Sequence, residues 1–84
     1  MAFDVQIKRS AEKEFRALPE QLRSRIGSAL QSLAAEPFPT GAKKLRNRND
    51  FRIRVGDYRI LYTVDEVAQQ IFVVAIGHRK DIYR

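Results

Sequence analysis

The sequence predicts an α+β fold, because helical and strand periodicities occupy separate parts of one short chain. Apolar residues recur at helical spacing between residues 10 and 35, whereas residues 51–64 and 71–76 are rich in β-branched and aromatic side chains. The chain has 84 residues, of which 44% are hydrophobic and 31% charged, a globular balance. We therefore expect residues 1–84 to form a single domain.

The first elements are a strand and a short helix. Residues 3–7 alternate apolar and polar side chains, the period of a half-buried strand. Ser10 is the expected N-cap of the helix that follows. Ala11, Phe15 and Leu18 recur at helical spacing behind it.

A second helix is predicted from Pro19 to about Ala35. Proline fits the first turn of a helix, where its missing N–H is not needed. One apolar stripe then follows, formed by Leu22, Ile26, Ala29, Leu30 and Leu33. Pro37 and Pro39 end the helical region, and no periodicity returns before Phe51. A connection of about 14 residues is long for a compact domain, and such loops often carry function.

Residues 51–64 predict a β-hairpin. Two β-rich runs meet at Gly56-Asp57, and a two-residue loop with glycine first indicates a type II′ turn. This turn places Val55 opposite Tyr58, Arg54 opposite Arg59, Ile53 opposite Ile60, and Arg52 opposite Leu61. Strand alternation then puts six residues on one face, Phe51, Ile53, Val55, Tyr58, Ile60 and Tyr62. The other face carries Arg52, Arg54, Arg59 and Leu61.

A last strand is predicted over residues 71–76. This run is apolar on both sides, which indicates a central strand covered on both faces. Antiparallel pairing with the preceding strand would bring its C-terminal end beside Tyr58 and Arg59. We therefore expect residues 77–84 to leave the sheet close to the arginine face.

Positive charge is concentrated in one segment. The chain carries a net charge of +6, and seven basic residues between positions 43 and 59 are opposed by only two acidic ones. The basic residues are Lys43, Lys44, Arg46, Arg48, Arg52, Arg54 and Arg59. Such a block fits an anionic partner, with nucleic acid ahead of an acidic protein segment or a membrane surface. A solvated basic surface is the plainer alternative.

Composition argues against several classes of protein. There is no cysteine and one histidine, so a disulfide framework and a zinc site are not expected, and a reducing cytoplasm suits the chain. The longest apolar run, residues 71–76, is too short to span a bilayer, and residues 1–9 alternate instead of forming a signal peptide. We expect no metal, no cofactor and no membrane partner.

The arginine face suggests chemistry on a nucleic-acid backbone. Two arginines directly opposite each other destabilise a sheet, so the cluster is hard to explain as structure alone. Guanidinium forks bind phosphate bidentately and could stabilise the extra negative charge of a phosphoryl transition state. RNA supplies its own 2′-hydroxyl nucleophile, leaving only proton transfers to the protein. Tyr83, with its pKa lowered by nearby cations, and His78 are the alternatives for that role.

Three segments resemble the RelE/ParE superfamily of toxin–antitoxin toxins. They read KKLR at residues 43–46, FRIRVGDYRILY at 51–62 and IGHRKDIYR at 76–84. The resemblance covers nearly the whole chain. It implies two N-terminal helices packed on a small antiparallel β-sheet. For RelE-like members it also implies a ribosome-dependent endoribonuclease that cuts mRNA in the A site and is neutralised by a RelB-like antitoxin.

Site residues follow from the same resemblance, position by position. The basic residues of the family's hairpin fall on Arg52, Arg54 and Arg59. Its tail arginine falls on Arg79 and its tail tyrosine on Tyr83. Lys44 and Arg46 match loop residues that contact RNA, and Lys43 and Arg48 extend that basic loop. The alternatives are a ParE-like DNA gyrase inhibitor and a non-catalytic basic module that binds an antitoxin or nucleic acid.

Overall fold

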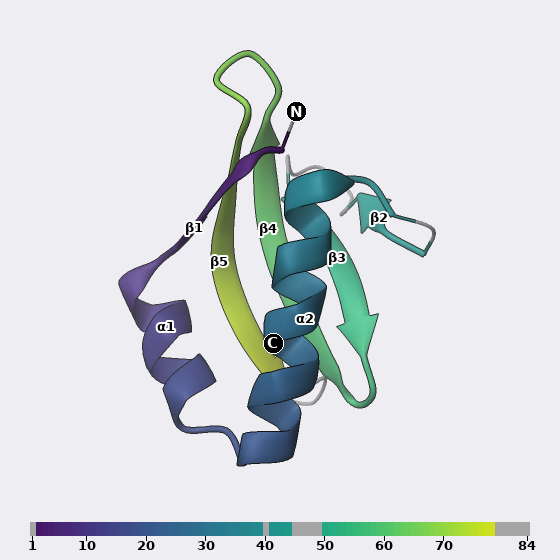
Figure 1. Ribbon diagram of the computed structural model, residues 1–84. Coiled ribbons are helices and arrows are strands. Elements are labelled where there is room, and N and C mark those ends of the chain that lie inside the picture. The colour runs from purple at the N-terminus through teal and green to yellow at the C-terminus, as the bar shows by residue number, and fades with distance from the viewer. Residues whose placement is uncertain (1, 40, 45–49, 79–84) are drawn as a thin grey trace.

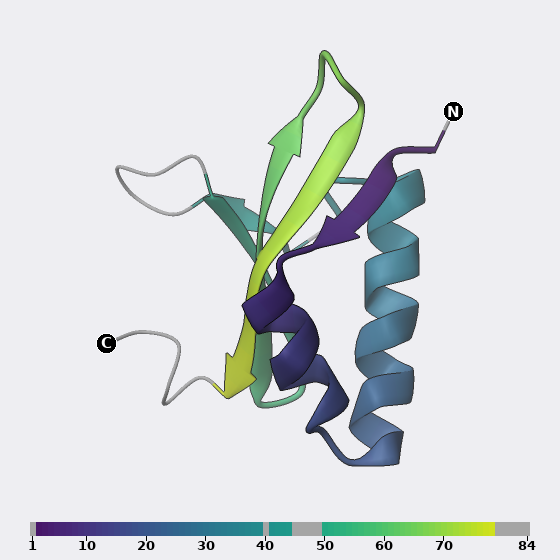
Figure 2. The same ribbon diagram turned by 90° about the vertical axis from the view of Figure 1, so that its left-hand side faces the viewer.

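The computed structural model describes residues 2–39, 41–44 and 50–78, which form two helices and one five-stranded sheet. The elements in chain order are β1 (Asp4–Ile7), α1 (Arg9–Arg16), α2 (Glu20–Ala35), β2 (Lys43–Lys44), β3 (Asp50–Val55), β4 (Tyr58–Asp65) and β5 (Gln70–His78). Both helices lie on one side of the sheet (Figure 1 and Figure 2). The predicted α+β class with two N-terminal helices is confirmed.

The sheet is mixed, in the order β1-β5-β4-β3-β2. The pairs β2–β3, β3–β4 and β4–β5 are antiparallel, whereas β1 pairs parallel with β5, with Val5 opposite Ile71. The expectation of a wholly antiparallel sheet is therefore wrong for β1. In the sequence, α1 and α2 lie between β1 and the other strands. The partner of β1 is therefore set by long-range packing and not by a turn.

Both helices begin without a side-chain cap. α1 starts at Arg9, because Lys8 is the last residue with extended backbone (φ −59°, ψ 143°) and its carbonyl accepts the N–H of Glu12. Ser10 therefore lies inside the first turn, and the prediction that it caps the helix is wrong. α2 ends at Ala35, as predicted, but it begins at Glu20, so Pro19 is the N-cap and not a residue of the first turn. Neither helix among the described residues is long and apolar enough to cross a membrane.

The core lies between α2, α1 and one face of the sheet. Ile26 and Leu33 of α2 and Ile60 and Tyr62 of β4 are almost fully buried, and Ala11 is the buried residue of α1. These residues belong to a single hydrophobic cluster. Fully burying an aliphatic or aromatic side chain stabilises a fold by about 1.5–3 kcal/mol. The apolar stripe of α2 is thus what holds the sheet against the helices.

β5 contains a β-bulge that the sequence did not indicate. Leu61 lies opposite Ala75 but Tyr62 lies opposite Val73, so the register shifts by one residue on β5. The shift lets Ile71, Val73 and Ile76 all face the helices, although their spacing breaks strict alternation. The strand was expected to be covered on both faces, but Phe72 on the other face is 41% exposed. On the same face Leu61 of β4, which lies opposite Ala75, is only 5% exposed, so burial on this face varies along the strand.

The β3–β4 hairpin has the predicted register. Arg54 lies opposite Arg59, and Ile53 lies opposite Ile60. Gly56 has a φ of 60°, whereas Asp57 does not lie in the left-handed region. Positive φ at only the first central residue defines a type II′ turn, so the turn prediction is confirmed.

The connection between α2 and β3 was predicted to have no regular structure, but it contains a strand. Lys43 and Lys44 form β2 and pair with Arg52 and Phe51. A turn precedes this strand, in which the N–H of Ala42 donates to the carbonyl of Pro39 at 2.9 Å. Gly41 occupies the third position with a φ of 94°, which a type II turn requires.

Replacing Gly56 by alanine should destabilise the protein by about 1–2 kcal/mol, because an L-residue is strained at this φ. A steric clash does not cause this loss of stability, since a Cβ at Gly56 would meet only Arg25 guanidinium atoms at 3.5 Å or more. Urea denaturation of wild type and Gly56→Ala measures the difference in the free energy of unfolding.

Gly27→Ala is the matched control. Gly27 lies inside α2, and a Cβ there would make an ordinary 3.9 Å contact with Phe15. Alanine should therefore stabilise the helix by about 0.5–1 kcal/mol. Equal stability of wild type and Gly56→Ala would contradict the type II′ turn.

Candidate functional site

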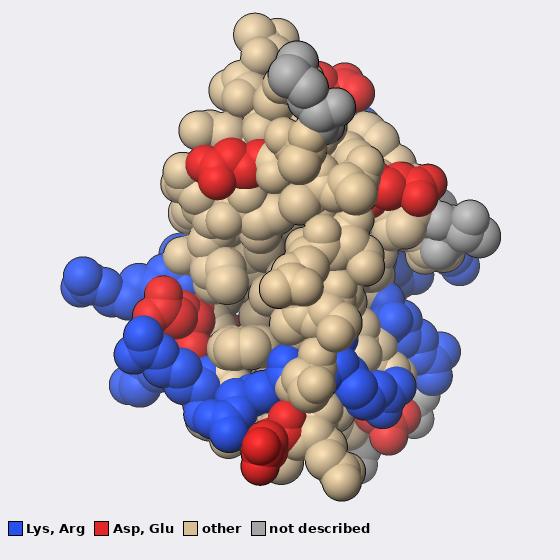
Figure 3. Space-filling model, in the orientation of Figure 1, with Lys and Arg blue, Asp and Glu red and all other residues tan. Residues whose placement is uncertain are grey.

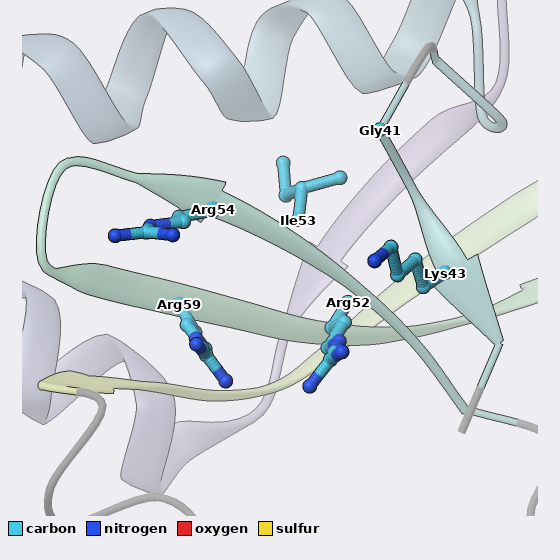
Figure 4. A pocket seen from close by; sticks show the side chains of 6 residues that line it. All are labelled: Gly41, Lys43, Arg52, Ile53, Arg54 and Arg59. Carbon is cyan, nitrogen blue, oxygen red and sulfur yellow. The ribbon is translucent and has the colours of Figure 1, made fainter. Parts of the chain in front are cut away.

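Four basic side chains surround one hollow on the sheet. The hollow has a volume of about 140 Å³ and is lined by Gly41, Lys43, Arg52, Ile53, Arg54 and Arg59 (Figure 4). We call this the cationic hollow. Its basic residues come from three adjacent strands, β2, β3 and β4.

Strand register is what gathers these charges. Arg54 and Arg59 are direct cross-strand partners in the hairpin, and Arg52 pairs with Leu61 on one side and Lys43 on the other. Side chains of directly paired residues share a face, with Cβ atoms about 5 Å apart. The two ladders therefore bring all four cations to the same region of the sheet.

The arginines have different orientations. Arg52 and Arg59 project on the same side, away from α2, whereas Ile53 points toward the helix (Figure 4). Arg54 extends toward the turn, where its Nε donates a 3.1 Å hydrogen bond to the carbonyl of Gly56. Arg54 is exposed, and Arg52 and Arg59 are half-buried. Two guanidiniums are thus directed into one region while the third is held beside it.

This arrangement fits a phosphate ligand. Arginine stays charged at any physiological pH, and its planar fork matches two phosphate oxygens. Four positive charges around a small hollow attract a phosphodiester and would stabilise additional negative charge on it. No three His, Cys, Asp or Glu residues of the described ranges form a group that could hold a metal ion.

Not all predicted site residues lie at the cationic hollow. Lys44 pairs with Phe51, so strand alternation directs it to the side opposite Lys43. His78 pairs with Tyr58, and their rings meet edge to face at 5.5 Å. Tyr58 packs against the core, so His78 lies on the helix side of the sheet, away from Arg59. The structure thus separates His78 from the cationic hollow.

Four predicted residues fall outside the described part of the chain. These are Arg46 and Arg48 in the connection to β3, and Arg79 and Tyr83 after β5.

The sequence did not identify Gly41 and Ile53 as residues that line the hollow, nor the contact that the Tyr62 hydroxyl makes. Pro37, Pro39 and Gly41 fall within five residues, and such a cluster of turn-forming residues could have indicated a chain reversal beside the lysines. Tyr62 was assigned only to the buried face, yet its hydroxyl donates to the carbonyl of Pro37 at 2.8 Å. Burial raises the pKa of Tyr62 to about 12.

Positive charge is unevenly distributed among the described residues. Residues 26–42 and 60–78 contain no lysine or arginine, although they contain Glu36, Asp65 and Glu66. On the face drawn in Figure 3, the described lysines and arginines gather toward the end that holds the α1–α2 connection and the β3–β4 turn. A field of this kind steers an anionic partner toward one end of the protein.

Sequence comparison places the chain in a known family. The family model described as "ParE toxin of type II toxin-antitoxin system, parDE" matches residues 5–83. Toxin RelG of Mycobacterium tuberculosis is 31% identical over 87 aligned positions, which cover 100% of this chain and 99% of RelG.

Solved structures agree with this placement. RelE from the archaeal RelE–RelB complex of Pyrococcus horikoshii is 26% identical and superposes with a TM-score of 0.85 over 96% of this chain and 99% of its own. The isolated RelE toxin of E. coli is 25% identical, with a TM-score of 0.82 over 98% of this chain and 92% of its own. The chain therefore belongs to the RelE/ParE superfamily and is a RelE-family toxin of the type II toxin–antitoxin kind.

Proposed function

We propose that the protein is an mRNA interferase, an endoribonuclease that cleaves ribosome-bound mRNA in the A site and so inhibits translation in the cytoplasm. The cationic hollow is the single observation that supports this proposal most. It offers Lys43, Arg52, Arg54 and Arg59 to one small anionic group. Membership of a family with RelE toxins supports the same activity.

The proposed reaction is an internal transesterification of RNA. The 2′-hydroxyl oxygen attacks the adjacent phosphorus, and the bond from phosphorus to the 5′-oxygen of the next nucleotide breaks. One proton leaves the 2′-hydroxyl and another is delivered to the 5′-oxygen, which gives a 2′,3′-cyclic phosphate and a 5′-hydroxyl end. The protein must position the phosphate, stabilise its added charge and move these two protons.

Each residue is assigned a role in this reaction. Arg59 and Arg79 hold the scissile phosphate, and Arg52 and Arg54 support it or relay protons. Tyr83, which lies outside the described residues, is assigned to assist proton transfer because the resemblance to RelE-like toxins implies that role. We give His78 no step, since it lies on the helix side of the sheet. Lys43, Arg46 and Arg48 extend the contact with the RNA backbone, and Lys44, which faces the other side of the sheet, contributes less to it.

A cognate RelB-like antitoxin is the proposed partner that controls this activity. Structures similar to this chain include the RelE–RelB complex of Pyrococcus horikoshii and the intact RelBE complex of E. coli. An acidic antitoxin segment would neutralise the concentrated positive charge of the cationic hollow. Toxin–antitoxin affinity should then fall as salt rises, and an affinity independent of salt would contradict electrostatic capture.

The alternative to RNA cleavage is inhibition of DNA gyrase, because the matching family model is the one named for ParE. Primer extension on a defined message, with and without ribosomes, and a gyrase supercoiling assay distinguish the two activities. Codon-linked cuts on ribosome-bound message support the interferase. Loss of supercoiling without RNA cuts supports the gyrase inhibitor.

Arg59→Ala should lower the cleavage rate about 10²–10³-fold, the usual loss when one preorganised charge-stabilising group is removed. Arg59 carries none of the core packing, so the free energy of unfolding should change by less than about 1 kcal/mol. Single-turnover cleavage of ribosome-bound message and urea denaturation measure the two quantities.

Arg16→Ala is the control, because Arg16 lies on α1 with a 76% exposed side chain paired to Glu12. It should leave cleavage unchanged. A fully active Arg59→Ala protein with wild-type stability would remove Arg59 from the catalytic role.

Lys43→Ala should reduce both RNA affinity and the salt dependence of binding. Losing one phosphate contact lowers the slope of log K against log salt by about 0.7 for single-stranded RNA. Lys44→Ala should have a smaller effect, because Lys44 faces the other side of the sheet. A larger effect of Lys44→Ala would contradict the assignment of Lys43 to the hollow.

A further inference from the structure

We propose that Tyr62 is a positioning residue for RNA binding, which acts by fixing the segment that carries Lys43 into the cationic hollow. This inference rests on the proposed function, because it concerns how the same hollow is assembled. It concerns a buried side chain on the helix side of the sheet, which cannot itself touch a ligand on the arginine side.

The hydroxyl of Tyr62 has a specific partner. Tyr62 is fully buried, and a buried hydroxyl costs free energy unless it is hydrogen bonded. It donates to the carbonyl of Pro37 at 2.8 Å, across 25 residues of chain. Because burial raises the pKa of Tyr62 to about 12, the phenol remains a protonated donor throughout the physiological range.

Aromatic packing holds the same segment at a second point. The rings of Tyr62 and Phe51 stack with centroids 5.9 Å apart, and these residues are direct partners across β3 and β4. Phe38 then packs edge-on against Phe51, with centroids 5.0 Å apart. The chain leaving α2 is thus attached to the sheet at Pro37 by a hydrogen bond and at Phe38 by a ring contact.

The attached segment leads directly to Lys43. After Phe38 the chain turns at Pro39–Ala42 and enters β2, where Lys43 pairs with Arg52. β2 is only two residues long, and so short a strand has little stability of its own. Its position beside Arg52 therefore depends on the attachment that precedes it.

The orientation of Tyr62 excludes a direct role. It faces the core with Ile60, whereas Arg59 and Leu61 lie on the alternate face of β4. Any effect of the Tyr62 hydroxyl on RNA binding must therefore pass through Pro37 and the β2 segment. This dependence can be measured by combining substitutions of Tyr62 and Lys43.

Tyr62→Phe removes the hydroxyl and keeps the ring. With an RNA oligonucleotide carrying a 2′-deoxy substitution at the cleavage site, we expect binding about three- to tenfold weaker than wild type, the loss that corresponds to one hydrogen bond. With cleavable message, KM should rise similarly while kcat stays within about twofold. Fluorescence anisotropy and steady-state cleavage measure these values.

A double-mutant cycle tests the route of the effect. If Tyr62 acts through Lys43, the Tyr62→Phe/Lys43→Ala protein should bind no more weakly than Lys43→Ala alone. Losses that add in full would show that Tyr62 does not work through Lys43, and would overturn the inference.

Phe38→Ala tests the same segment in a second way, because Phe38 is 43% exposed and its removal spares the core. It should also weaken binding and raise KM.

Tyr58→Phe is the matched control, since Tyr58 lies on the same face of β4 but contacts His78 instead of the β2 segment. It should bind RNA as wild type does. Amide NMR signals of Gly41 and Lys43 should shift in Tyr62→Phe and not in Tyr58→Phe.

The outcomes separate the inference from the proposed function. Wild-type protein that fails to bind or cleave RNA would contradict the function, and the positioning role with it. Wild-type protein that binds RNA, together with a Tyr62→Phe protein of unchanged affinity and unchanged Gly41 and Lys43 signals, would contradict the positioning role alone.

Discussion

The antiparallel pairing of β3 with β4 is the interaction on which the site depends. This pairing puts Arg54 opposite Arg59 and Ile53 opposite Ile60, so one ladder builds both the arginine face and part of the core. Like charges directly opposite each other destabilise a sheet by a few tenths of a kcal/mol to about 1 kcal/mol. Burying one core side chain such as Ile60 contributes about 1.5–3 kcal/mol. The core face of the hairpin therefore outweighs the repulsion on its other face.

The parts of the fold that could be predicted are those set by local chemistry. A glycine followed by aspartate between two β-rich runs determines the turn, and the turn determines which arginines meet. The end of α2 at Ala35 is likewise encoded nearby, by Pro37. Arg52, Arg54 and Arg59 could be grouped from sequence because only one turn separates their strands.

The features that could not be predicted depend on contacts between distant segments. β1 and β5 are far apart in the sequence and no turn joins them. The parallel pairing of β1 with β5 therefore follows from how the intervening elements pack. Residues 43–44 show no strand periodicity, and they become β2 because Arg52 and Phe51 lie at an open sheet edge. The bulge opposite Leu61 is a response to packing, since it lets Ile76 join Ile71 in the core. The Tyr62 hydrogen bond spans 25 residues and left no local signal.

The central claim is that Arg52, Arg54 and Arg59 act together as one binding site for the phosphate backbone of RNA. The most direct test is to observe the Nε–H signals of these arginines by NMR while titrating the uncleavable 2′-deoxy-substituted RNA oligonucleotide. Our account predicts that the three signals shift together and yield a single Kd, while the signal of Arg16 on α1 does not move. Shifts that are absent, that give unrelated Kd values or that appear at Arg16 instead would contradict it.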